Sequence, residues 1–202
     1  VYKRQTLTLD LGLQQLAESL MDGKKGSIVA IEPASGEVLA LVSAPDFDPG
    51  RLVGPERGEY YRQLVVDPDK PLFNRAIKAT YRPGSIWKIV QGLIALDEGR
   101  IRPGTRFPCD RELIGCHGPH TQDDLREAVV HSCNPYFYRV MQRVVQAGEG
   151  KGRFEQAANG LDHWRERGQA FGFGTSLGAR LPGTSTGNIP GSADYDLSLI
   201  HI

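Results

Sequence analysis

Ser85 and Lys88 stand three residues apart and together could turn a serine hydroxyl into a nucleophile. A helix that begins at Ser85 would place both side chains on one face, about one turn apart. A lysine whose pKa is lowered by burial or by neighbouring cations could then accept the hydroxyl proton. Backbone N–H groups at such a helix start would favour a developing oxyanion. The alternative interpretation is a serine N-cap followed by an exposed lysine.

A Ser-x-Asn triplet, Ser132 to Asn134, lies further along the chain than Ser85. Pro135 suits a first helical position, so Asn134 could simply cap a helix and Ser132 could be a loop hydroxyl. A Ser-x-x-Lys pattern alone is a weak signal, because four-residue patterns arise by chance. The two motifs in this order are much less expected by chance, and together they favour a catalytic interpretation.

Three cysteines and two histidines share a short region next to the second motif. Three cysteines are too few for two disulfides and one too many for one. The spacing offers a Cys₃His set, a common composition for structural zinc, formed by Cys109, Cys116, His120 and Cys133. His117 is the alternative nitrogen ligand. A disulfide or buried free thiols are the other interpretations of these cysteines.

The elements that position the motifs can be inferred from caps and apolar spacing. Asp10 can cap a helix that closes near Gly23. Two runs rich in β-forming residues, 27–32 and 37–43, flank a four-residue turn and predict a hairpin. The segment 46–78 is polar and irregular.

The second half of the chain predicts mainly helices. Apolar residues recur at helical spacing from the Ser85 motif to Gly99. A loop is expected over 100–123, followed by helices over 124–130 and 135–146. Ser132 and Asn134 would therefore lie between two helices.

Composition indicates a globular piece. The chain has 202 residues, 40% of them hydrophobic, which suits one domain with a core, and no interior linker separates two domains. The 24 basic and 24 acidic residues give no net charge that would attract nucleic acid or an anionic membrane. No apolar run is long enough to cross a bilayer.

The segment 79–88 resembles the active-site segment of the penicillin-binding transpeptidases, whose motifs include Ser-x-x-Lys, Ser-x-Asn and Lys-Thr-Gly. Segment 26–43 is similar to the opening hairpin of that domain, and segment 44–49 is similar to the family's stretch directly after the hairpin. The resemblance is strongest to the elongation-type class B branch. It implies an α+β fold, a partial penicillin-binding or serine β-lactamase-like fold with a sheet hairpin and a helical subdomain, over residues 6–196.

The sequence departs from the family at its ends. No Lys-Thr-Gly or Lys-Ser-Gly triplet occurs, and the resemblance implies that the C-terminal strands are missing. Residues 1–5 and 197–202 are expected to be non-native ends. Without the Lys-Thr-Gly strand, we expect the fragment alone to be nearly inactive and prone to aggregation.

The resemblance implies a peptidoglycan D,D-transpeptidase of cell-wall elongation. Ser85 would form the acyl-enzyme with Lys88 as its base, Ser132 would pass a proton to the leaving amine, and β-lactams would acylate the same serine. Asn134 would hold the substrate backbone. A β-lactam sensor domain, a serine β-lactamase and a structural metal-binding module are the alternatives.

The same resemblance implies where the protein works and with what. Peptidoglycan stem peptides, β-lactams and a membrane glycosyltransferase of the elongation machinery are the expected partners. The expected location is the periplasmic side of the bacterial inner membrane, with no role for nucleic acid. Some members of the branch hold zinc at the place of the cysteine region, with carboxylates where this chain has Cys.

Overall fold

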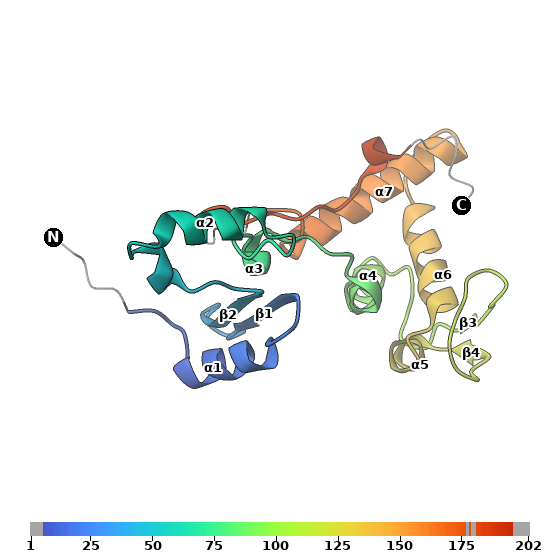
Figure 1. Cartoon of the computed structure of the whole chain (residues 1–202). Helices are drawn as coiled ribbons and strands as arrows, with labels where there is room; N and C mark the ends of the chain where they lie inside the picture. The colour runs from blue at the N-terminus through green and yellow to red at the C-terminus, as the bar shows by residue number, and fades with distance from the viewer. Residues whose placement is uncertain (1–5, 177, 179–180, 196–202) are drawn as a thin grey trace. The chain divides into compact units, whose positions relative to one another are not determined.

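The computed structural model describes residues 6–176, 178 and 181–195, which form two compact units (Figure 1). The first unit contains the chain up to Thr80 and a returning segment that ends at Ser185. The second unit runs from Tyr81 to Gly178 and resumes at Thr186. The division falls directly before the Ser85 motif, where composition gives no linker signal. The extent of the partial domain, 6–196, stays a prediction, and the two expected non-native ends, 1–5 and 197–202, lie outside the described residues.

The first unit begins with a helix and a hairpin, as predicted. Helix α1 (Leu11–Leu20) is capped by Asp10, whose carboxylate accepts a hydrogen bond from the N–H of Leu13 at 2.8 Å. Strands β1 (Gly26–Ile31) and β2 (Val38–Ala44) pair in antiparallel fashion. Both predicted strands are therefore confirmed to within one residue, and the predicted helix begins after Asp10 as expected but ends at Leu20, three residues before Gly23.

Helix α1 lies along the hairpin and closes a small core (Figure 1). Ala17 of the helix is buried against Ala40 and Val42 of β2. The Gln14 side chain also pairs with the backbone of Leu41, donating to its carbonyl at 3.3 Å and accepting from its N–H at 2.8 Å. These two bonds fix the register of the helix against the strand.

The segment expected to be irregular contains helical structure. It forms a 3₁₀ turn η1 (Pro49–Leu52), helix α2 (Arg57–Val66) and a short helix α3 (Arg75–Lys78). Helix α2 buries only Tyr60 and Leu64, so its apolar periodicity is too sparse to predict a helix. The expectation of an irregular segment was wrong for this reason.

The second unit starts with the motif helix. A 3₁₀ turn η2 (Gly84–Ile86) runs directly into α4 (Trp87–Asp97). The α-helix thus begins two residues later than predicted, and Ser85 lies in the 3₁₀ turn. Gly99 adopts a positive φ of 65° after the helix, the conformation that commonly ends a helix.

Two further helices flank the Ser-x-Asn triplet, as the sequence predicts. Helix α5 (Leu125–Val130) starts with a capping box between Asp124 and Glu127. Helix α6 (Asn134–Val145) begins after three intervening residues. The preceding loop contains one short ladder between β3 (Phe107–Pro108) and β4 (Gln122–Asp123).

Helix α7 (Arg153–Ala170) completes the second unit and is followed by a 3₁₀ turn η3 (Ser192–Asp194). Gly160 lets α7 approach α6 very closely, because a Cβ at this position would lie 1.9 Å from the carbonyl oxygen of Val145. Helices α4, α6 and α7 enclose the larger core, whose fully buried members include Ile94, Tyr136, Val140 and Val144. Among the described residues, no helix is both long and apolar enough to span a membrane.

Candidate active site and an adjoining thiol cluster

Ser85 is exposed at the start of the motif helix. Gly84 before it adopts a φ of 61°, a left-handed conformation that glycine reaches without steric strain. Within the described part of the chain, the Ser85 hydroxyl makes no hydrogen bond or ion pair. Ser85 is therefore open to a reacting group from solution.

Lys88 is the centre of a network of hydrogen bonds with Ser132 and Asn134. Its ammonium Nζ donates to the carbonyl of Ser132 at 2.6 Å and to the Ser132 hydroxyl at 2.9 Å. It also donates to the Asn134 side-chain oxygen at 2.5 Å. The structure thus brings together three of the four predicted catalytic residues, from two segments 44 or more positions apart, and leaves the Ser85 hydroxyl outside this network.

Burial lowers the pKa of Lys88 from its ordinary value of 10.5, because the charged amine is partly removed from water. Negative charge on Cys116 and Cys133 opposes this shift by stabilising the protonated amine. The net direction is downward, which increases the neutral fraction of the amine. A neutral amine is what a base for Ser85 requires.

Ser132 has a strained backbone. Its φ is 51°, in the left-handed region that a residue with a side chain rarely adopts. Such a conformation costs on the order of 1–3 kcal/mol and is found preferentially at functional sites. It allows both the carbonyl and the hydroxyl of Ser132 to face the same lysine amine.

Asn134 connects the Lys88 network to the loop that contains Cys109 and Cys116. Its amide nitrogen donates to the carbonyl of Gly115 at 2.7 Å, while its oxygen accepts from Lys88. Cys133, not Asn134, occupies the N-cap position of α6 and makes no side-chain capping bond. The interpretation of Asn134 as an N-cap was therefore wrong, since its side chain is engaged elsewhere.

The predicted metal ligands lie together. One ligand atom from each of Cys109, Cys116, His120 and Cys133 falls within 4.8 Å of the others. The Cys116 sulfur is 3.6 Å from Nε2 of His120. His117 does not belong to this group of four, and all three cysteines are free rather than disulfide-bonded. We call these four residues the thiol cluster.

The cysteines of the thiol cluster differ in acidity. Burial raises the pKa of Cys133 to about 12, because its thiolate would lie in the core. Burial also acts to raise the pKa of Cys116. Hydrogen bonds from the backbone of Asn134 and from the Cys109 thiol outweigh that effect and lower the pKa of Cys116. Of these two thiols, Cys116 therefore ionises first.

Asp123 and His131 adjoin the thiol cluster and were not predicted. Asp123 is 1% exposed, and its carboxylate lies 3.0 Å from Nδ1 of His131 and 3.5 Å from Nε2 of His120. The two histidine rings stack with centroids 4.7 Å apart. The sequence gives only a weak signal for the contact between Asp123 and His131. Asp123 stands directly before Asp124, which caps α5, so it reads as part of the same helix cap.

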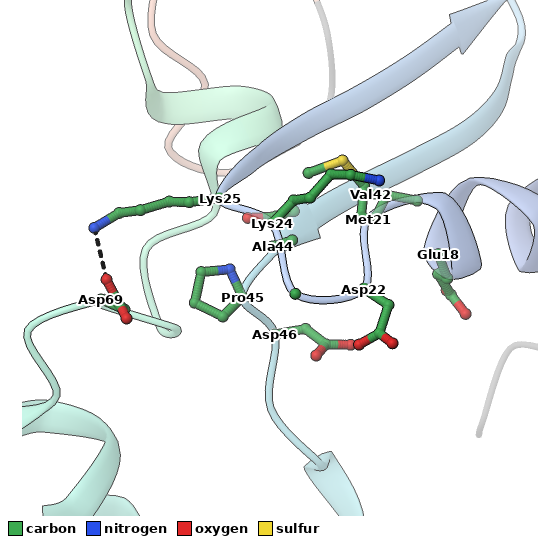
Figure 2. A pocket seen from close by; sticks show the side chains of 12 residues that line it. Glu18, Met21, Asp22, Lys24, Lys25, Val42, Ala44, Pro45, Asp46 and Asp69 are labelled. Carbon is green, nitrogen blue, oxygen red and sulfur yellow. Dashed lines mark hydrogen bonds and ion pairs between the residues drawn. The ribbon is translucent and has the colours of Figure 1, made fainter.

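A separate pocket of about 510 Å³ lies in the first unit, lined by the end of α1, the turn before β1 and the end of β2 (Figure 2). Its rim has mixed charge, with Lys25 and Asp69 paired at 2.9 Å. No residue of the Ser-x-x-Lys or Ser-x-Asn motifs lines it. The polar network around Lys88 is therefore the better candidate for an active site.

The chain is similar to known proteins along most of its length. Residues 26–201 match the model of the penicillin binding protein transpeptidase domain. A curated relative, peptidoglycan D,D-transpeptidase MrdA of Acinetobacter baumannii, is 32% identical over 194 residues. That alignment covers 91% of this chain but 27% of the relative, so the chain spans about a quarter of the relative's length.

Solved structures with a similar fold include three that illustrate the likeness. PBP2 from Pseudomonas aeruginosa, in complex with WCK 5153, gives a TM-score of 0.75 at 29% identity, covering 92% of this chain and 41% of its own. A penicillin G acyl-enzyme of penicillin-binding protein A from Mycobacterium tuberculosis gives a TM-score of 0.68 at 30% identity. The match covers 93% of this chain and 45% of that structure's chain. A peptidoglycan synthase complex that coordinates polymerization and crosslinking gives a TM-score of 0.72 at 29% identity. The match covers 93% of this chain and 35% of that structure's chain.

Proposed function

The chain belongs to the penicillin-binding protein transpeptidase family, and we propose that its protein is a peptidoglycan D,D-transpeptidase of the elongation type, penicillin-binding protein 2. The observation that carries the proposal is the Lys88 network, in which the Ser-x-x-Lys helix meets the Ser-x-Asn turn. A β-lactamase or sensor role would use the same Ser-x-x-Lys pair, but the named relatives favour the transpeptidase.

The proposed acylation step uses Ser85, Lys88 and Ser132. The Ser85 oxygen attacks the carbonyl carbon between the two terminal D-Ala residues of a stem peptide, while the neutral amine of Lys88 takes the hydroxyl proton. Ser132, already hydrogen-bonded to Lys88, passes that proton to the nitrogen of the departing D-Ala. The C–N bond breaks as the Ser85 ester remains.

Deacylation transfers the stem peptide to a second strand. An amine from a neighbouring stem attacks the ester carbonyl, its proton returns through Lys88 to the Ser85 oxygen, and a cross-link replaces the ester bond. Asn134 holds the stem backbone through its amide, which Lys88 and Gly115 orient. A β-lactam reacts at Ser85 by the first of these steps.

The proposed setting is the periplasmic side of the inner membrane. The acyl-enzyme of a structural relative with penicillin G supports β-lactams as ligands. The structural similarity to a peptidoglycan synthase complex supports a membrane glycosyltransferase as partner. Stem peptides follow as the substrate of the proposed reaction.

Labelling with a fluorescent penicillin tests the proposal. The full-length gene product should become covalently labelled, and Ser85→Ala should abolish the label because the acyl acceptor is lost. Ser19→Ala, an exposed serine of α1, is the matched control and should label normally. Labelling that persists in Ser85→Ala would overturn the assignment of Ser85.

We also propose that the thiol cluster holds a structural zinc ion. The donor set fits, because three thiols and one imidazole are ligands that zinc prefers, and their ligand atoms are already gathered within 4.8 Å. The lowered pKa of Cys116 makes this thiol easier to ionise, and a thiolate is the form that binds zinc. Bound zinc would hold the loop of Gly115 and the Cys133 end of α6 together, and so would stabilise the turn that carries Ser132.

Metal analysis distinguishes the two candidate nitrogen ligands. The purified gene product should contain about one zinc per chain, and His120→Ala should lose it. His117→Ala, the neighbouring histidine outside the thiol cluster, should retain it. Zinc retained by His120→Ala and lost from His117→Ala would reverse the assignment, and no zinc in the wild type would remove it.

A further inference from the structure

Gln91 and Trp164 form a buried hydrogen bond between α4 and α7. The indole Nε1 of Trp164 donates to the Gln91 side-chain oxygen at 2.8 Å. Gln91 is 4% exposed and Trp164 8%. An indole N–H can only donate, so this bond fixes which atom of the Gln91 amide is the oxygen. Gln91 lies about one turn after Lys88 on the same helix.

The same tryptophan supports the residue before Lys88. The Trp87 ring meets the Trp164 ring edge to face, with centroids 5.8 Å apart, and meets Phe173 at 4.9 Å. Gly168 of α7 also lies beside this ring, since a Cβ there would be in ordinary van der Waals contact with it at 3.8 Å. Lys88 is therefore bracketed on its own helix by two side chains, Trp87 and Gln91, that both contact Trp164.

A second face of α4 packs against side chains of α5 and α6. A Cβ at Gly92 would lie 3.3 Å from Leu125 of α5 and 3.7 Å from Phe137 of α6. Helix α4 thus contacts α5 and α6 at Gly92, and it contacts Trp164 through Trp87 and Gln91. Contacts on these two faces hold its rotation about its own axis.

The Gln91 amide nitrogen is buried and has no hydrogen-bond partner among the described residues. An unsatisfied buried donor destabilises a fold by about 1–3 kcal/mol. An apolar residue of similar size would avoid this penalty in a helix core. The fold retains a polar group here even though stability alone disfavours it.

We propose that Gln91 and Trp164 are positioning residues that set the rotation of α4 and so direct the Lys88 amine at the Ser132 hydroxyl and the Asn134 side-chain oxygen. The inference deepens the proposed transpeptidase function and rests on it. A small rotation of α4 would move Nζ of Lys88 away from acceptors that it now meets at 2.5–2.9 Å. Misplacement of a reacting group by about 1 Å can slow a reaction by about 100-fold.

Three variants of the full-length gene product test this role. Gln91→Leu removes the acceptor and leaves the Trp164 N–H unsatisfied. The double variant Gln91→Leu with Trp164→Phe removes both polar groups and leaves no unsatisfied donor at this contact. Ser192→Ala is the matched control, because its hydroxyl bonds to Asp162 on α7 at 2.5 Å, away from α4. Each variant is measured for thermal stability, for reversible penicillin affinity and for the first-order acylation rate.

A positioning role predicts slow acylation with normal affinity. In Gln91→Leu and in the double variant, the acylation rate should fall about 10- to 100-fold while reversible affinity stays unchanged. The double variant should nevertheless regain thermal stability relative to Gln91→Leu. Ser192→Ala should acylate at the wild-type rate.

Two other results have distinct meanings. A double variant that acylates at the wild-type rate would overturn the positioning role and leave the hydrogen bond purely structural. A wild-type protein that penicillin never labels would instead overturn the proposed transpeptidase function, and this inference with it. The wild-type measurement thus separates the two failures.

Discussion

Lys88 is supported from two directions, and the two supports differ in chemistry. On one side, Ser132 and Asn134 bind its amine, and the amide of Asn134 connects to the loop of the thiol cluster. On the other side, Trp164 holds the helix through an aromatic contact and one buried hydrogen bond. The first support adjoins the thiol cluster, where we propose a zinc ion. The second rests on ring packing and on the hydrogen bond between Gln91 and Trp164, neither of which involves the thiol cluster, so the two supports can be perturbed independently.

Removing the amine that both supports hold should have the largest effect. Lys88→Ala should slow acylation of Ser85 by about 10²- to 10⁴-fold, because the general base is lost. Stopped-flow measurement with a fluorescent penicillin gives the rate. Lys151→Ala, an exposed lysine of the second unit, is the control and should react normally. A Lys88→Ala rate within threefold of wild type, about 0.7 kcal/mol in barrier, would show that another base acts.

Breaking the thiol cluster should come next. Cys116→Ser should weaken zinc binding by about 10- to 100-fold or more and lower the melting temperature. Acylation should fall in parallel, because the Gly115 loop that orients Asn134 loses its anchor. Calorimetry and acylation kinetics on the same preparation check this. Loss of zinc with an unchanged acylation rate would show that the thiol cluster does not help to hold Ser132 and Asn134 against Lys88.

The pH dependence of acylation sharpens the comparison. Burial lowers the pKa of Lys88 below 10.5, and only the neutral amine can accept the Ser85 proton. The acylation rate should therefore rise with pH and reach half its maximum below pH 10.5. Penicillin hydrolysis in buffer alone is subtracted at each pH. A rate that falls as pH rises would contradict the role of Lys88 as base.

The smallest effect is expected at Gly92, where α4 packs against α5 and α6. Gly92→Ala adds a methyl group 3.3 Å from the flexible end of Leu125. The gain in helix propensity, about 1 kcal/mol, should largely offset the tighter packing. Denaturant unfolding should show a change of less than about 1 kcal/mol. A fall of more than about 3 kcal/mol in the free energy of unfolding would mean that the packing around Gly92 is too rigid to accept a methyl group.

Local signals in the sequence predicted much of this arrangement. Asp10 and Asp124 marked helix starts that the structure confirms, because capping depends on neighbouring residues alone. The spacing of Ser85 and Lys88, and the order of the two motifs, predicted a site in which Lys88, Ser132 and Asn134 do meet, while the catalytic roles stay predictions. The cysteine spacing identified the four residues of the thiol cluster.

Long-range and sparse features were not predictable in this way. Helix α7 contains Gly160 and Gly168, which weaken any helix signal, and their use becomes clear only from the helices packed against them. The bond between Gln91 and Trp164 joins residues 73 positions apart. Nothing local in the sequence distinguishes Gln91 from an ordinary helix residue.

Mass spectrometry of the penicillin adduct tests the central claim most directly. The full-length gene product is treated with penicillin G, digested, and the modified peptide is sequenced. The account predicts one adduct per chain, an ester on Ser85, formed at a rate that depends on Lys88. An adduct on Ser132 or on a cysteine of the thiol cluster, with Ser85 unmodified, would contradict it.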